Sequence, residues 1–204
     1  MILKRGSWGK EVATLQSLLG VSVDGFFGPV TEKAVMEYQR AHNIFPIDGI
    51  VGPKTMAMMA VIDIKKTNKR TIKEIICHCT ATKEGQMVTV ADVDKWHRAQ
   101  GWPNGIGYHY LIYLDGSVHV GRDVDMIGSH CKNHNSHSIG VCYVGGLDLN
   151  GKPKDTRTES QKKAFEVLLK KLKQLYPNAS IHGHNEFSAK ACPCFDVRKE
   201  YSKI

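Results

Sequence analysis

The sequence predicts an α/β domain preceded by a small three-helix domain, and three observations lead to this prediction. Short apolar runs alternate with longer segments of helical periodicity in the second part of the chain. A 24-residue repeat occupies the first part, and a basic segment separates the two. We therefore expect a three-helix domain at 1–60, a basic linker at 61–73 and a larger domain at 74–204.

The N-terminal repeat consists of two copies of a turn followed by the start of a helix. Residues 23–31 (VDGFFGPVT) match residues 47–55 (IDGIVGPKT). Asp-Gly favours a tight turn, and proline suits the first helical position, where its missing N–H costs nothing. An earlier amphipathic stretch with Val12, Leu15 and Leu18 supplies the third helix. Because this part contains no cluster of histidines, cysteines or paired carboxylates, we expect it to bind or scaffold.

The periodicity of the larger domain predicts four strands and two helices. The helix at 158–176 carries Phe165, Leu168 and Leu172 on one face. The strands are expected at 74–80, 108–114, 117–121 and 138–144, and the other helix at 90–100.

A loop near the C-terminus, residues 184–196 (HNEFSAKACPCFD), combines histidine, lysine and cysteine in a segment too short and Pro-broken for a helix. One such loop cannot complete a tetrahedral zinc site, so we expect a further ligand from the strand at 74–80. His78, His184 and Cys192 would form a three-ligand site whose fourth position is free, as in catalytic zinc sites. On the opposite face of that strand, Cys77 and Cys79 are expected to be small buried residues.

Alternatives to this ligand set remain open at this point. Cys192 and Cys194 flank a proline and suggest a redox pair, although their spacing is not Cys-x-x-Cys. Cys194 is an alternative thiolate ligand, and His182 an alternative imidazole ligand. Glu186 is a candidate proton shuttle or a carboxylate that hydrogen-bonds a ligand histidine.

Half of the net charge of +8 lies in the linker, which contains five basic residues and one acidic residue. The segment at 64–70 has neither apolar periodicity nor aromatic residues, so we expect a solvated tether and no nucleic-acid partner. A basic surface also suits a polyanionic bacterial envelope.

No apolar run is long enough to span a membrane, and the first ten residues lack the features of a signal peptide. We therefore expect a monomer that is cytoplasmic in the producing cell, without stable membrane insertion. Its six cysteines are expected to be reduced thiols.

The N-terminal pattern resembles the peptidoglycan-binding type 1 domain over nearly all of residues 4–60. The matching positions are Gly9, Leu15-Gln16, Asp24-Gly25, Phe27-Gly28-Pro29, Tyr38-Gln39 and Asp48-Gly49. The resemblance implies that this domain holds cell-wall glycan or stem peptide in a surface groove, and it assigns no individual contact residue.

Residues 73–201 resemble the zinc-dependent type 2 N-acetylmuramoyl-L-alanine amidases, which include phage lysozyme-type endolysins and peptidoglycan recognition proteins. The motifs are CHCTAT at 77–82, GYHY at 107–110, SIGVCYVGG at 138–146 and the loop from His184 to Pro193. The resemblance implies a mixed central sheet flanked by helices, with Zn²⁺ in a cleft at the sheet edge.

The same resemblance implies zinc ligands at His78, His184 and Cys192 and functional roles for Tyr108 and Lys190. Zinc would activate a water molecule, Lys190 would stabilise the developing oxyanion, and Tyr108 would orient the water or assist proton transfer. The expected reaction is hydrolysis of the amide between the lactyl group of N-acetylmuramic acid and L-alanine in bacterial peptidoglycan.

Two other functions remain, a non-catalytic peptidoglycan receptor and a zinc peptidase that cuts the stem peptide. Receptor-like relatives often lack the cysteine ligand, so Cys192 argues against the first. Together with the wall-binding module, the expected cytoplasmic synthesis suggests a phage or prophage endolysin that acts on the wall after release.

Overall fold

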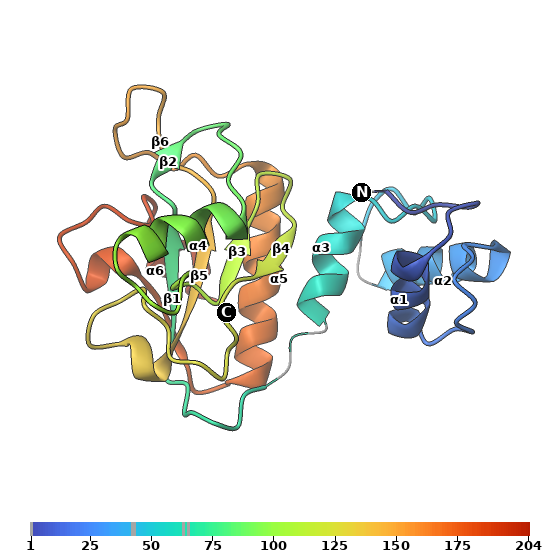
Figure 1. Ribbon diagram of the computed structural model, residues 1–204, viewed down its shortest axis with the longest axis horizontal. Helices are drawn as coiled ribbons and strands as arrows, with labels where there is room; N and C mark the ends of the chain where they lie inside the picture. The colour runs from blue at the N-terminus through green and yellow to red at the C-terminus, as the bar shows by residue number, and fades with distance from the viewer. Residues whose placement is uncertain (1, 42–43, 63, 65) are drawn as a thin grey trace. The chain divides into compact units, whose positions relative to one another are not determined.

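The computed structural model describes residues 2–41, 44–62, 64 and 66–204. It divides into two compact units, Met1–Asp63 and Ile64–Ile204 (Figure 1). Within the described residues, no helix combines the length and the apolar character that crossing a membrane requires.

The first unit contains three helices, as the repeat predicts. They are α1 (Lys10–Leu19), α2 (Pro29–Ala41) and α3 (Pro53–Ile62), and prolines begin α2 and α3. The predicted helix α1 contains Leu18, which is 47% exposed because the buried face of this helix runs through Val12, Leu15 and Gln16. The core of the unit is formed by Leu3, Val12, Leu15, Phe27, Val35, Val51 and Met59.

A buried glutamine ties each copy of the repeat to the helix before it. Nε2 of Gln16 donates to Asp24 Oδ1 at 2.7 Å and to the Phe26 carbonyl at 3.0 Å. Its Oε1 accepts the backbone N–H groups of Asp24 and Gly25. Gln39 makes the same bonds to the second copy, at Asp48, Gly49 and Ile50. Two side-chain amides therefore hold both turns.

Replacing Gln16 with alanine is expected to destabilise the first unit by ~2–3 kcal/mol, because the buried groups of the turn lose their partner. The neighbouring Ser17 is exposed on the same helix, so Ser17→Ala is the matched control. Hydrogen–deuterium exchange read by mass spectrometry should show faster exchange in the first unit of Gln16→Ala alone. Equal protection in the two variants would show that the glutamine is dispensable.

The second unit is built on a five-stranded mixed sheet in the order β4-β3-β5-β1-β7, which confirms the predicted fold class. The β3–β4 pair is antiparallel and the other pairs are parallel. The strands are β1 (Glu74–Cys79), β3 (Tyr110–Ile112), β4 (Val118–Val120), β5 (Ser138–Tyr143) and β7 (Ser180–Gly183). A separate pair consists of β2 (Thr82–Lys83) and β6 (Gly146–Leu147).

Helices cover both faces of this sheet. Cys142 of β5 packs with Val93 of α4 (Val90–Ala99), whereas the next residue, Tyr143, contacts Phe165 of α5 (Glu159–Leu175). Because successive strand residues point to opposite faces, α4 and α5 lie on opposite sides of the sheet (Figure 1). His78 of β1 is in register with Cys142, which places it on the α4 face.

The elements that were not predicted include β7, the short helix α6 (Val197–Tyr201) and the two-residue strands β2 and β6. Strand β7 has a mostly half-exposed four-residue sequence without clear alternation. Helix α6 is anchored by Arg157, whose guanidinium pairs with Glu200 at 2.7 Å and lies 3.3 Å from the Phe195 ring centroid. These contacts fasten the chain just beyond the histidine- and cysteine-containing loop.

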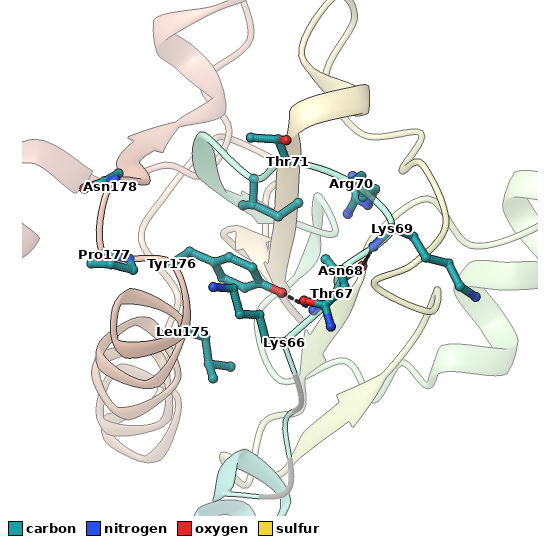
Figure 2. Close-up of a pocket in the computed structure, with 11 residues that line it drawn as sticks. Lys66, Thr67, Asn68, Lys69, Arg70, Thr71, Leu175, Tyr176, Pro177 and Asn178 are labelled. Carbon is teal, nitrogen blue, oxygen red and sulfur yellow. Dashed lines mark hydrogen bonds between the residues drawn. The ribbon is translucent and has the colours of Figure 1, made fainter.

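The described part of the basic segment is not the solvated tether that its composition predicts. The N–H of Thr67 donates to the Tyr176 hydroxyl at 2.7 Å, and Figure 2 shows the two side by side. Arg70 donates to the carbonyls of Val124 and Ser138. The segment therefore packs against the second unit, because its polar side chains satisfy backbone carbonyls there. Residues 63 and 65 lie outside the described residues.

Figure 2 also shows the hollow that this segment forms with residues 175–178. Its cationic side chains are largely engaged, since Arg70 is bound as above and Lys69 pairs with Asp125 at 3.0 Å. None of the side chains that the sequence singles out for chemistry lines it. We interpret the hollow as a consequence of segment docking.

Candidate functional site

Three metal-type donors converge on the α4 face of the sheet. Their ligand atoms, from His78, His184 and Cys192, all lie within 4.8 Å of one another. Nδ1 of His78 is 3.7 Å from Sγ of Cys192, and the His78 and His184 ring centroids are 4.6 Å apart. A tetrahedral zinc ion separates a nitrogen and a sulfur ligand by roughly 3.6 Å. Both the donor types and this spacing fit Zn²⁺.

Strand pairing explains why the two histidines meet. Strand β7 runs parallel to β1, with Cys77 opposite Gly183. The residues that follow, His78 and His184, are therefore neighbours at the carboxyl ends of these two strands. His184 begins the short 3-10 turn η2 (His184–Glu186).

Cys192 is held in place by two hydrogen bonds that involve the strands. The N–H of Cys79 donates to Sγ of Cys192 at 3.3 Å. The hydroxyl of buried Tyr143 donates to the carbonyl of Pro193 at 2.9 Å. These contacts position the thiol before any ion is bound.

The second ring nitrogen of His78 faces His130. The distance from His78 Nε2 to His130 Nδ1 is 3.0 Å, and Nε2 of His130 lies 3.4 Å from Ser138 Oγ. Gly140 makes room for the His130 ring, because a Cβ at residue 140 would lie 2.7 Å from the Cδ2 atom of that ring. Burial, followed by the neighbouring histidines, holds the pKa of His78 well below 6.5. His78 is therefore neutral, as a metal ligand must be.

The sequence does not single out His130 as a partner of His78. Its place beside His78 depends on a loop 52 residues further along the chain, and no local spacing indicates it.

Tyr108 lies beside the donor cluster. Its ring centroid is 5.2 Å from that of His78 and 5.5 Å from that of His97. Burial raises the pKa of its phenol well above 10, so the hydroxyl is protonated at neutral pH. The preceding loop is fixed by buried Arg122, which donates to the Ile106 carbonyl at 2.8 Å.

Lys190 is exposed on the loop that carries Cys192. Its charge lies close enough to the cluster to contribute, after burial, to lowering the pKa of His184. The loop therefore brings a positive charge to the donor cluster.

The structure places the alternative candidates elsewhere. Cys194 lies 3.9 Å from Cys79 Sγ and 3.1 Å from the Gly146 carbonyl, so its neighbouring thiol is Cys79. Both ring nitrogens of His182 are engaged, with Glu186 and with Ser180. Glu186 also accepts the Gly183 N–H at 2.8 Å. The carboxylate therefore supports the loop through His182, and the expectation that it bonds a ligand histidine is wrong.

The second unit thus combines a mostly parallel mixed sheet with a His-His-Cys cluster at the carboxyl ends of β1 and β7. These two features can be compared with those of known proteins. Residues 68–195 match the family described as N-acetylmuramoyl-L-alanine amidase, and residues 9–59 match the putative peptidoglycan binding domain. The chain therefore belongs to the N-acetylmuramoyl-L-alanine amidase family, and it also carries a peptidoglycan-binding domain.

Within that family, the chain is similar to phage endolysins. It is 41% identical to the endolysin of Klebsiella phage KP32 over 140 residues, 69% of this chain and 92% of the relative. The solved amidase LysCS from Clostridium intestinale shares the fold, with a TM-score of 0.56 and 24% identity over 69% of this chain and 86% of that one.

Structural similarity extends to peptidoglycan recognition proteins. The complex of proteins LCa and LCx with tracheal cytotoxin contains a chain with a TM-score of 0.54 and 28% identity. This match covers 69% of the present chain and 86% of that chain. The fold is thus shared by an endolysin amidase and by peptidoglycan recognition proteins.

Proposed function

We propose that the chain is a zinc-dependent amidase that hydrolyses the bond between the lactyl group of N-acetylmuramic acid and L-alanine in bacterial peptidoglycan. The observation that carries this proposal is the convergence of His78, His184 and Cys192. Zinc, when bound by these residues, supplies a Lewis acid and lowers the pKa of coordinated water to about 7.

The protein's own groups complete the proposed chemistry. His78 presents Nδ1 to the cluster, and the hydrogen bond between its Nε2–H and His130 fixes the ring orientation. The Lys190 ammonium stabilises negative charge on the carbonyl oxygen as the amide is attacked. The protonated Tyr108 hydroxyl donates a hydrogen bond that orients the reacting groups. These roles assign Tyr108 and Lys190 to catalysis.

Product analysis distinguishes the amidase from the two other functions. Isolated peptidoglycan is incubated with the purified chain, and the released fragments are identified by mass spectrometry. The amidase releases intact stem peptides that begin with L-alanine. Fragments cut inside the peptide would indicate a peptidase, and binding without release by zinc-loaded protein would indicate a receptor.

We also propose the division of labour that the sequence suggests, with residues 1–60 binding the wall, 61–73 connecting and 74–204 carrying the amidase. The match to the peptidoglycan-binding domain supports the first role. The relatedness to phage endolysins supports action on the cell wall after release from the producing cell. We propose that the chain acts there as a monomer.

An exposed apolar patch on the first unit is our candidate for wall contact. Trp8 is 82% exposed and forms an antiparallel bridge with Phe26, which is 51% exposed. Directly opposed residues project to the same face of such a bridge. Exposed aromatic groups of this kind mark interaction surfaces.

Trp8→Ala is expected to weaken sedimentation with insoluble peptidoglycan on the order of tenfold, as the loss of one aromatic anchor does. Leu149, also exposed but in the second unit, supplies the matched control Leu149→Ala. Unchanged sedimentation of the Trp8 variant would place the contact elsewhere.

A further inference from the structure

A second group of metal-type donors lies at the other end of β1 from His78. The ligand atoms of Glu74, His134 and His137 are all within 4.8 Å of one another. Nδ1 of His134 is 2.8 Å from Oε2 of Glu74, and Nε2 of His137 is 3.4 Å from the same oxygen. An extended strand places Glu74 and His78 roughly 13 Å apart. The Glu74–His134–His137 cluster is therefore separate from the first.

The local backbone aligns the two imidazoles. His134 precedes and His137 ends the 3-10 turn η1 (Asn135–His137), and the His137 N–H donates to the His134 carbonyl at 3.2 Å. Side chains three residues apart eclipse one another in a 3-10 helix, so both rings face the same way. Their centroids are 5.7 Å apart.

Sheet pairing brings the carboxylate to these rings. Glu74 begins β1 and is in register with Ser138, the residue after His137. The N–H of Lys73 donates to the His137 carbonyl at 2.7 Å. The carboxylate and the turn are therefore joined by the backbone itself.

The turn is also fixed from the outside. Oδ1 of Asn135 accepts the N–H groups of His130 and Cys131 at 2.8 and 2.9 Å. Arg70 donates to the Asn135 carbonyl at 3.2 Å, and the Phe187 ring centroid is 4.0 Å from that of His134. The donors are thus held together by contacts that need no ion.

We propose that this cluster is a second binding site for a divalent transition metal ion of the zinc type. Two imidazoles and a carboxylate are a recognised zinc ligand set, and they leave a fourth position for water. Tetrahedral zinc separates such ligand atoms by roughly 3.3 Å, a value that lies between the two observed distances of 2.8 and 3.4 Å. The side chains are 17–31% exposed, so an ion can enter from solvent.

An ion at this position would link the start of β1 to the loop that also carries His130. Since His130 is hydrogen-bonded to the His78 ring, an ion at the second site would also stabilise the position of His130 beside the first site. Binding to the native state alone should raise the melting temperature further as a second equivalent of metal is added.

The test is a titration of the metal-free, full-length chain with Co²⁺, followed by absorption spectroscopy, with Zn²⁺ stoichiometry by calorimetry in parallel. Cys192 gives the first site a thiolate-to-cobalt charge-transfer band that the second site lacks. We expect two equivalents, of which one contributes only ligand-field absorption. The variant His134→Gln/His137→Gln should lose that equivalent and keep the charge-transfer band.

Two further variants complete the test. His119→Gln removes a half-exposed histidine outside the cluster. The protein with this substitution should bind both equivalents of metal. Glu74→Gln, close in shape to the native residue, should lose the second equivalent even if the double variant folds poorly. A single equivalent in the wild-type chain, or a second one retained by folded cluster variants, would overturn the proposal. Absence of the charge-transfer band alone would count against the Cys192 site instead.

Discussion

Replacing Cys192 with serine is expected to remove the bound zinc and to lower amidase turnover by about a thousandfold, equivalent to ~4 kcal/mol of transition-state stabilisation. The Cys192 thiol is 3.7 Å from the His78 nitrogen, and a serine hydroxyl does not replace a thiolate as a zinc ligand. Metal content by mass spectrometry and turnover on isolated peptidoglycan measure the two effects.

Cys194→Ser is the matched control for this variant. The Cys194 thiol is two residues away but lies beside Cys79 and the Gly146 carbonyl. The Cys194→Ser variant should therefore keep both its zinc and its amidase activity. If the Cys192→Ser variant retained zinc and the Cys194→Ser variant lost it, Cys194 would be the ligand and Cys192 would not.

The second large effect is expected from Lys190→Ala and Tyr108→Phe, each of which should lower turnover about a hundredfold or more while zinc remains bound. Lys190 brings a positive charge to the donor cluster, and Tyr108 has its ring 5.2 Å from that of His78. Neither side chain belongs to the ligand cluster. Turnover and zinc content should therefore separate in these variants.

Lys199→Ala is the control for the lysine variant, since this side chain is exposed on α6, outside the loop. Lys190→Arg should recover part of the turnover, because it restores the charge but not the compact ammonium group. Near wild-type turnover for Tyr108→Phe or Lys190→Ala would remove that residue from the mechanism.

The fold class and the candidate donors were accessible from sequence because strand alternation and loop composition are local patterns, whereas the pairing of β1 with β7 that brings His78 and His184 together is not local. Strand alternation placed His78 opposite Cys77 and Cys79, and the proline-containing loop identified His184 and Cys192 as candidates. Capping boxes at Thr89 and Thr158 begin α4 and α5 within one residue of the predicted helix starts.

Features that depend on distant partners were missed. The segment around Thr67 and Arg70 is polar, so its burial became visible only with the carbonyls that it contacts. Glu74 and His134 are 60 residues apart, and only the pairing of β1 with β5 brings them together. Local periodicity carries no signal of such contacts.

The most direct test of the account is amide hydrolysis on a soluble muramoyl-L-alanyl peptide by the metal-free and zinc-restored chain. The measurement is the appearance of the free α-amino group of L-alanine. We expect no product after chelation and recovery of the rate with one equivalent of zinc at the Cys192 site, and this is the central prediction. Undiminished release of L-alanyl peptide from fully metal-free protein, or none from zinc-loaded protein, would contradict it.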